Sequence, residues 1–379
     1  MPDLLVAAGR VVTPARTFAP GWVHIEGDQI AAVGPGEPPR PPDLDLPDGT
    51  IVPGFVDTHV HGGGGASFDG GDPAEVERAV LAHRAHGTTT MLASLVTDTV
   101  DGLIASSARL ADLVDDGLVA GIHLEGPWLS PQHQGAHDPA LLTVPDDRAV
   151  GRLLEAMHVH LRMVTLAPEL PGAPDAIRRL VSAGVVVAIG HTDATYDQAR
   201  AALDAGAAVG THLFNAMRGL HHREPGPVVA LLEHPDAYVE LIADGVHVHP
   251  AIIGLAAAAK PHLTVLVTDA MAAAAAEDGD YRLGSLVVEV RDGVARLPGG
   301  GAIAGSTATM ATAVRHAVRR AGLSLEDAVR AATATPAALH GLTRVGTLRP
   351  GTYADLVVLD DDLSVRRVMR RGEWLRPAP

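Results

Sequence analysis

The sequence predicts an α/β protein, a (β/α)₈ TIM-like barrel with a small β-sandwich domain formed by both chain termini. Two patterns in the 379 residues predict it. Between residues 51 and 270, eight short apolar runs alternate with longer amphipathic stretches, which is the rhythm of strands followed by helices. At both ends, short strand-like segments occur without such helices, and we expect these terminal segments to pair into one small sheet.

The small domain is predicted to comprise residues 1–50 and 345–379. Residues 3–33 carry its first strands, because apolar runs there are broken by Gly, Asp and Pro. Residues 34–49 are so rich in proline and glycine that we expect a loop. Two further strand-like segments, 352–360 and 365–375, end the chain.

The barrel domain is predicted to comprise residues 51–344. Several of its helical stretches end in glycine, which is typical of a helix C-terminus. A doubly wound sheet is the alternative, but no G-x-G-x-x-G follows the first run. A β-hairpin insertion with an Asp-Gly turn is expected near 281–300. The eight expected strands lie at 51–60, 88–95, 118–125, 161–168, 185–191, 207–213, 238–245 and 263–270.

Composition excludes several classes of protein. The chain has no cysteine, which removes disulfides, thiolate nucleophiles and thiolate-ligated metals. Its single lysine, Lys260, is not in a P-loop context. The net charge of −16 argues against nucleic-acid binding. We find no signal peptide and no run of about 18 apolar residues, so we expect a cytoplasmic protein without a membrane partner.

Histidines and carboxylates gather where the predicted strands end. In a barrel the carboxyl ends of the strands share one face, and active sites lie there. Each such residue alone has an ordinary explanation, such as a polar strand end, a helix cap or a buried histidine with a satisfied ring. Ordinary explanations at so many strand ends at once are improbable. The residues are His59, His61, Glu125, His191, His212, Asp244 and Asp269.

This set of side chains fits divalent metal ions. Glu125, His191 and His212 offer two nitrogens and a carboxylate and leave a position open for water. His59 and His61, two apart on a strand, point the same way and fit a second ion together with Asp269, with Glu125 as the bridge. Two ions about 3.5–4 Å apart would hold a hydroxide between them. Asp269 can then accept the proton of the attacking water and pass it to a leaving nitrogen.

The sequence resembles the N-acetylglucosamine-6-phosphate deacetylases of the amidohydrolase superfamily. The similar segments follow the same order over nearly the whole chain. HLEGPWL, THLFNAM and IADGVHV are specific to that family, whereas His-x-His and the final aspartate belong to the superfamily. The segments are PGFVDTHVHG, HLEGPWLSPQHQGAH, IGHTDAT, THLFNAM, REPG, IADGVHV, LVTDAM and AGSTATM.

The resemblance implies a role for each matching residue. His59, His61, Glu125, His191, His212 and Asp269 would be metal ligands, and Asp269 also the catalytic acid and base. His137 would polarise the acetyl carbonyl and stabilise the oxyanion. Arg223 would grip the phosphate, and in the family this arginine can come from the partner subunit, which implies a homodimer. The remaining substrate contacts would be Ala136, Asn215, Ala216, His247, Ile303 and Ala304.

The resemblance also limits the metal chemistry. Some family members replace the first two histidines by Gln and Asn and use one metal, whereas this chain keeps His59 and His61. Other amidohydrolases bridge their metals with a carboxylated lysine, but Lys260 is expected near the opposite face, so Glu125 must bridge. One or two divalent ions are expected, zinc first, with iron, manganese or cobalt as alternatives.

The implied activity is the hydrolysis of N-acetyl-D-glucosamine 6-phosphate to D-glucosamine 6-phosphate and acetate, in amino-sugar catabolism and cell-wall recycling. Two related activities stay open at this point, namely an N-acetylgalactosamine-6-phosphate deacetylase and an N-acyl amino acid deacylase. A catalytically silent barrel that serves as a scaffold would lack ligands, whereas here every expected ligand is present.

Overall fold

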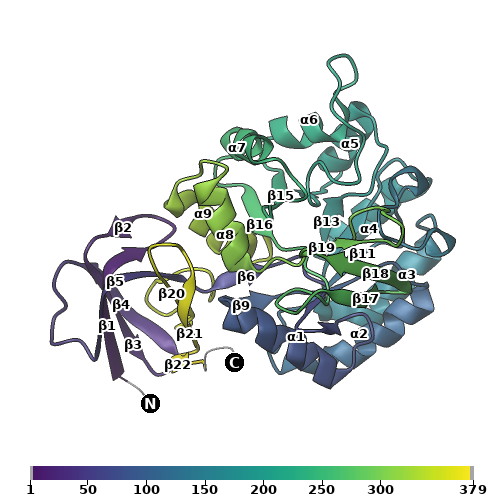
Figure 1. Ribbon diagram of the computed structural model, residues 1–379. Coiled ribbons are helices and arrows are strands. Elements are labelled where there is room, and N and C mark those ends of the chain that lie inside the picture. Colours follow the sequence, from purple (N-terminus) through teal and green to yellow (C-terminus); the bar gives the residue numbers. More distant parts are fainter. Residues whose placement is uncertain (1–2, 376–379) are drawn as a thin grey trace.

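A curled parallel sheet forms the centre of the molecule, as the computed structural model of residues 3–375 shows (Figure 1). Every predicted strand of the central region contains an observed strand, and neighbours in the sheet follow one another along the chain. The predicted second strand is split at Leu92 into β9, which pairs with β6, and β10. The strands are β6 (Phe55–Asp57), β9 (Thr88–Met91), β10 (Ala93–Leu95), β11 (Ile122–Glu125), β12 (Leu161–Leu166), β13 (Val186–Ile189), β14 (Val209–Gly210), β15 (Tyr238–Ile242) and β16 (Thr264–Val267).

The first and the last strand of this series lie beside each other. Val60 and Ala270 form a parallel bridge, and the backbone N–H of Asp269 donates to the carbonyl of His59 at 2.9 Å. The Thr268 hydroxyl donates to the fully buried carboxylate of Asp57 at 2.5 Å. These contacts bring the residues after β6 and after β16 to one place.

Helices follow most strands of the curled sheet and cover its outer face (Figure 1). The glycines expected to end four of the helical stretches, Gly87, Gly117, Gly184 and Gly206, all have positive φ, as glycines just past a helix do. The helices are α1 (Pro73–Ala85), α2 (Val100–Asp115), α3 (Asp147–Met157), α4 (Ala173–Ser182), α5 (Tyr196–Asp204), α6 (Gly226–Glu233), α7 (Pro250–Ala259), α8 (Met310–Arg319), α9 (Leu325–Ala331) and α10 (Ala334–Leu339). Single 3₁₀ turns lie at Pro131–His133, Pro139–Leu141 and His158–His160.

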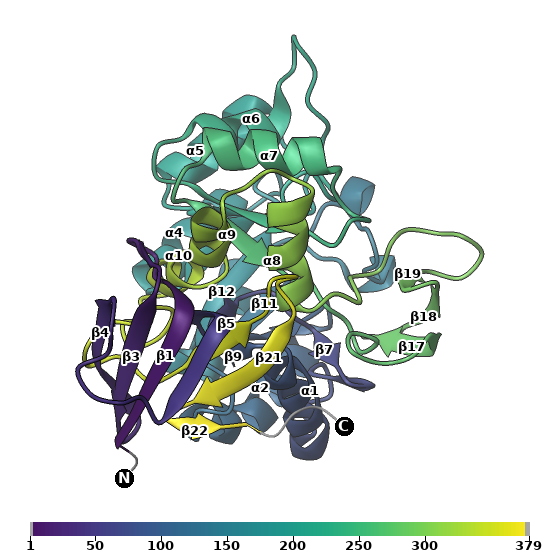
Figure 2. The same ribbon diagram turned by 60° about the vertical axis from the view of Figure 1, so that its left-hand side comes forward.

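Strands from both ends of the chain form one eight-stranded sheet, as expected. Its order is β22-β21-β20-β5-β1-β3-β4, with β2 paired to β1. The sheet lies to one side of the helices (Figure 2). In it, β20 pairs with β5 on one side and with β21 on the other. The strands are β1 (Asp3–Val12), β2 (Thr17–Phe18), β3 (Gly21–Glu26), β4 (Gln29–Pro35), β5 (Leu44–Pro53), β20 (Leu356–Leu359), β21 (Val365–Arg370) and β22 (Glu373–Trp374).

The prediction of a loop over 34–49 was wrong at its second half, because β5 already begins at Leu44. Leu44 and Leu46 pack against the apolar cluster of the terminal sheet, and the pairing of residues 44–46 with β1 outweighs the unfavourable Pro47. β20 pairs with the later part of β5, at residues 50–53. β5 also includes residues 51–53, which the sequence had given to the first barrel strand. The chain leaves this sheet at Gly54, where a Cβ atom would lie 2.2 Å from the Thr89 hydroxyl.

The predicted hairpin insertion is present and has a third strand. β17 (Gly279–Leu283) pairs with β18 (Leu286–Arg291), which pairs with β19 (Val294–Arg296). Asp292 and Gly293 both have positive φ, as a tight hairpin turn of this composition requires. The insertion stands apart from the terminal sheet (Figure 2). A two-residue ladder, β7 (Gly62–Gly63) with β8 (Ala66–Ser67), follows the first strand of the curled sheet.

Among residues 3–375, no helix combines the length and the apolar character that crossing a lipid bilayer requires.

The imidazole of His340, just after α10, makes folding stability depend on pH. It is 7% exposed, neither ring nitrogen has a hydrogen-bond partner among the described residues, and burial lowers its pKa to about 3. Below pH 6.5 the imidazole of His340 binds a proton in the unfolded chain but stays neutral in the folded chain. The free energy of unfolding therefore falls by about 1.4 kcal/mol for each pH unit below 6.5. We therefore expect His340→Leu to reduce the loss of unfolding free energy between pH 7 and pH 5 by roughly 2 kcal/mol.

Urea unfolding at the two pH values measures this difference. The control is His158→Asn at an exposed position, which should leave the loss unchanged. An equal loss in His340→Leu and the unmodified chain would contradict the prediction.

Candidate active site

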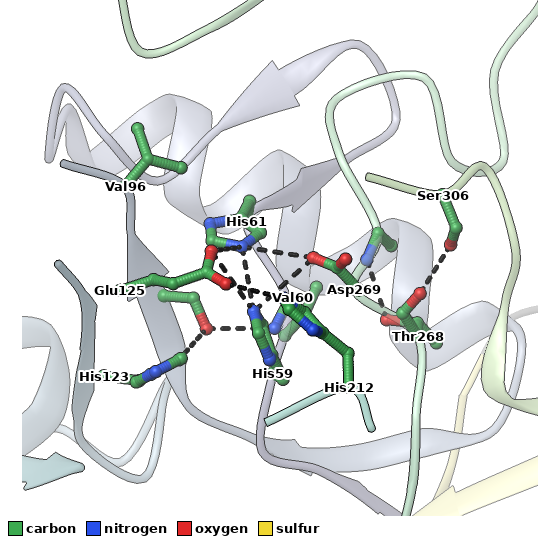
Figure 3. A network of polar contacts seen from close by, with 12 residues as sticks. His59, Val60, His61, Val96, His123, Glu125, His212, Thr268, Asp269 and Ser306 are labelled. Carbon is green, nitrogen blue, oxygen red and sulfur yellow. Dashed lines mark hydrogen bonds and ion pairs between the residues drawn. The ribbon is translucent and has the colours of Figure 1, made fainter. Parts of the chain in front are cut away.

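Six side chains that are far apart in the sequence converge at the carboxyl ends of the central strands. Figure 3 shows five of them, His59, His61, Glu125, His212 and Asp269. The structure brings together every residue that the sequence analysis expected to bind metal, and all six are at most 8% exposed. They form two sets that share Glu125. His59, His61, Glu125 and Asp269 form the outer set, and Glu125, His191 and His212 form the inner set.

The strands explain the convergence. Glu125 is the last residue of β11, and His191 and His212 each follow the end of their strand by two residues. His59 and His61 follow β6 and point the same way, as alternate residues of an extended chain do. Since parallel strands end at one edge, the polar residues that follow them meet there.

The inner set is built around one oxygen of Glu125. Its Oε1 lies 3.1 Å from Nε2 of His191 and 3.0 Å from Nε2 of His212, and these two nitrogens are 3.1 Å apart. The outer set uses the other oxygen. Oε2 lies 3.2 Å from Nε2 of His61 and 3.5 Å from Nε2 of His59. Glu125 thus lies between the sets, as a bridging ligand must.

Asp269 completes the outer set. Its Oδ1 is 3.3 Å from Nε2 of His61 and 3.4 Å from Nε2 of His59, while the two imidazole nitrogens are 3.1 Å apart. A tetrahedral ion with ligands about 2.0 Å away keeps them about 3.3 Å from one another. The separations in both sets are close to this value, so both could hold a divalent ion.

The charges of these buried groups support one another. Burial opposes ionisation of Asp269, but His59 and His61 outweigh it and lower the pKa of this carboxyl to about 2. The pKa of Glu125 is likewise held well below its usual range despite burial, chiefly by His59. Burial alone would lower the pKa of His61, yet Asp269 and Glu125 raise it to about 9. Both carboxylates are therefore ionised and available as ligands at neutral pH.

The far sides of two imidazoles are fixed by hydrogen bonds. Nδ1 of His191 donates to the carbonyl of His133 at 2.8 Å, which leaves Nε2 facing the other ligands. Nδ1 of His59 lies 3.1 Å from Oε2 of Glu240. Partners of this kind set which ring nitrogen is free to bind a metal.

The backbone is strained at several of these positions. His191, His212, Asp269 and Ala216 have φ values of 47°, 27°, 48° and 47°, a region that non-glycine residues rarely adopt. Such strain costs about 1–3 kcal/mol per residue and persists where the surrounding structure enforces it. Three of these four residues, His191, His212 and Asp269, belong to the two sets, so the surrounding structure holds them in place at some cost in conformational energy.

A cavity of about 360 Å³ opens next to the ligand sets. Of the predicted substrate-binding residues, Ala136, His137, Asn215, Ala216, His247 and Ile303 line it. Ala304 is not among its lining residues and is fully buried in the adjoining apolar cluster. Gln132, His133 and Leu283, which the sequence analysis did not select, line it as well.

Arg223 is not among the residues that line this cavity. It lies in the exposed loop that projects above α6, and its guanidinium contacts His222 at 2.7 Å (Figure 1). Within one chain, therefore, Arg223 does not contribute to the cavity.

Two further histidines of the cavity have defined orientations. Nδ1 of His137 accepts the backbone N–H of Thr97 at 3.4 Å, so its proton lies on Nε2, which faces Glu125 at 3.4 Å. Burial lowers the pKa of His137, so the ring is neutral. Burial would also lower the pKa of His247, but the Asp244 carboxylate, 2.7 Å from Nδ1, raises it and favours a positive charge.

Two buried carboxylates that we did not predict, Asp57 and Glu240, contact residues of the two sets. Asp57 accepts the backbone N–H groups of His59 and Thr268, and Glu240 contacts His59 and His212. Glu240 could have been found, because a glutamate in the middle of the apolar run YVELI is out of place unless it is paired.

A model of the amidohydrolase family matches residues 50–375. The chain belongs to this family. An N-acetylgalactosamine-6-phosphate deacetylase of Escherichia coli O157:H7 is 37% identical to this amidohydrolase, over 97% of this chain and 98% of the relative. An N-acetylglucosamine-6-phosphate deacetylase of Homo sapiens is 36% identical, over 98% of this chain and 90% of the relative.

Solved structures agree with these relatives. The N-acetyl-D-glucosamine-6-phosphate deacetylase of Mycobacterium smegmatis, solved as a mutant in complex with N-acetyl-D-glucosamine-6-phosphate, is 52% identical to this amidohydrolase. The match covers 99% of both chains with a TM-score of 0.97. The deacetylase of Thermotoga maritima is 32% identical, with a TM-score of 0.89 over 98% of this chain and 99% of its own.

Divalent ions should stabilise the fold through these ligands. A chain stripped with a chelator should have a lower Tm than the same chain with Zn²⁺, because an ion at 100 times its Kd adds about 2.7 kcal/mol. Glu125→Gln should lose most of this gain, since both sets lose their shared carboxylate. The exposed Glu155→Gln should keep it. Calorimetry with and without Zn²⁺ measures the gain, and an undiminished gain in Glu125→Gln would refute the assignment.

Proposed function

We propose that this amidohydrolase deacetylates N-acetyl-D-glucosamine 6-phosphate to D-glucosamine 6-phosphate and acetate, in the cytoplasm, within amino-sugar catabolism and cell-wall recycling. The carrying observation is the 52% identical M. smegmatis deacetylase, solved in complex with that sugar phosphate, whose fold covers 99% of both chains. The cavity beside two carboxylate–histidine sets supplies the matching chemistry.

Two divalent ions are proposed, one in each set, with zinc as the first candidate and iron, manganese or cobalt as alternatives. His191 and His212 would hold the first ion. His59, His61 and Asp269 would hold the second ion, and Glu125 would bind to both. Ions held there would lower the pKa of a bound water and polarise the acetyl carbonyl.

His137 is proposed to stabilise the oxyanion. When water adds to the acetamide carbonyl, negative charge develops on its oxygen. The backbone N–H of Thr97 donates to Nδ1 of His137, so the proton of this ring lies on Nε2 and faces the cavity. The ring is neutral, and its Nε2–H can donate a hydrogen bond to the oxyanion while the proton stays on the ring.

Asp269 is proposed as the general base and acid. Its carboxylate is ionised, since its pKa is lowered to about 2, so it can take the proton of the attacking water. It then delivers this proton to the nitrogen as the carbon–nitrogen bond breaks. The acetyl group leaves as acetate, and the amine remains on the sugar.

The phosphate is proposed to lie near Asn215, Ala216 and His247, with Ala136 and Ile303 shaping the sugar subsite. Ala304 does not line the cavity, so no contact between this residue and the sugar is proposed. The positive charge favoured on His247 suits a phosphate on a chain whose net charge is −16. We propose that Arg223 reaches the phosphate from the second subunit of a homodimer, since it is exposed and does not line the cavity of its own chain.

We also propose that the curled sheet is a (β/α)₈ barrel of residues 51–344 and that residues 1–50 and 345–379 form a small β-sandwich domain. The bridge between Val60 and Ala270 supports closure of the sheet, and the sheet of β1 to β5 with β20 to β22 supports the second domain.

A second candidate substrate is N-acetylgalactosamine 6-phosphate, which the name of the E. coli relative favours. Acetate release from a panel of N-acetylated sugars, each with and without the 6-phosphate, decides between the two. N-acyl amino acids belong in the same panel. A chain that hydrolyses none of them while retaining its ions would be a scaffold.

Asp269→Asn should reduce kcat by at least about 100-fold, because it removes the proton acceptor. The amide oxygen can still face an ion, so elemental analysis should find at least the inner ion retained. Acetate release under saturating substrate measures the effect. Residual activity above a tenth of normal would contradict the role of Asp269.

Arg223→Ala should raise KM for the phosphorylated sugar by about 10-fold or more and change kcat little, since the lost contact acts on binding. The exposed Arg178→Ala is the control. Binding should also weaken as salt rises from 50 to 500 mM. A KM that depends neither on Arg223 nor on salt would refute the phosphate assignment.

A further inference from the structure

Glu240 is a buried carboxylate that the proposed reaction does not use. It lies in the middle of β15, is fully buried, and has Val239 and Leu241 as neighbours along the strand. Among residues 3–375, its one ion-pair partner is His59. A carboxylate buried among apolar strands is costly unless an equal positive charge is close, so its retention needs an explanation.

Glu240 contacts residues of both ligand sets. Its Oε2 lies 3.1 Å from Nδ1 of His59 and accepts the backbone N–H of His212 at 3.3 Å. Its backbone carbonyl accepts the N–H of Leu213 at 2.8 Å, which fixes the strained turn at His212. Its other oxygen, Oε1, has no hydrogen-bond partner among the described residues.

The contact with His59 decides which ring nitrogen carries a proton. A carboxylate can only accept, so Nδ1 of His59 must be the donor. Nε2, which lies 3.1 Å from Nε2 of His61 and 3.4 Å from Asp269, then presents its lone pair to the outer set. Without Glu240 the neutral ring could place its proton on either nitrogen.

We infer that Glu240 is a positioning residue that lets His59, His61 and Asp269 take up a second divalent cation. It does so by holding the proton on Nδ1 of His59, which leaves Nε2 of this ring free to face the ion. The inference rests on the proposed two-ion centre and is independent of the substrate.

Titration of the chelator-stripped full chain with Zn²⁺, followed by elemental analysis, tests this inference. The unmodified chain should bind two ions. Glu240→Leu loses the acceptor for Nδ1 of His59, so its second ion should bind at least about 10-fold to 100-fold more weakly. The first ion should lose less affinity, because the side chain of Glu240 meets the inner set only through the backbone N–H of His212. Glu240→Gln keeps an acceptor for Nδ1 and should show a smaller loss. Asp355→Asn changes a buried carboxylate just before β20, far from both sets in the fold; it is the control and should bind two ions normally.

A second measurement covers the case in which Glu240→Leu does not fold. The Nδ1 proton of His59 in the zinc-loaded chain should give a downfield NMR signal that shifts in Glu240→Gln. Undiminished affinity for the second ion in both variants, or an absent Nδ1 proton, would overturn the inference. An unmodified chain that binds one ion would overturn the two-ion centre itself. Absence of acetate release with two ions bound would refute the proposed substrate and leave the role of Glu240 standing.

Discussion

The site depends on the position of Glu125, whose two carboxylate oxygens face different histidines. One oxygen faces His191 and His212, and the other faces His59 and His61. These four imidazoles come from three different strand ends, and Glu125 from a fourth. The carboxylate fits between them only while the strands keep their order around the sheet. The bridge of Val60 to Ala270 and the bond of Thr268 to Asp57 hold the last strand beside the first.

Much of this arrangement could be predicted from the sequence. The alternation of apolar runs and amphipathic helices placed all eight central strands, and the polar residues at their ends include all the side chains that the structure brings together in the two sets. The boundary at residues 44–53 could not be predicted in this way, because pairing with β1 and β20 overrides the turn-like composition of that segment. The local sequence carries no trace of those partners.

The supporting residues were harder to predict. Asp57 and Glu240 act through hydrogen bonds to groups distant in the chain, and their spacing follows no metal-ligand pattern. The exclusion of Arg223 from its own cavity also depends on the course of a loop, which periodicity does not describe. The orientation of the His137 ring could not be predicted either, because it depends on a hydrogen bond from the backbone N–H of Thr97, which lies 40 residues earlier in the chain.

The terminal sheet has a consequence for synthesis of the chain. β5 pairs with β20, about three hundred residues later, so the growing polypeptide carries one unpaired edge until β20 leaves the ribosome. The central sheet, by contrast, pairs neighbours in order and can assemble as translation proceeds. β5 therefore emerges before the central strands and acquires its second partner only after all of them. A translation product that ends before β20 would expose the unpaired backbone N–H and C=O groups of β5, which can pair with another chain.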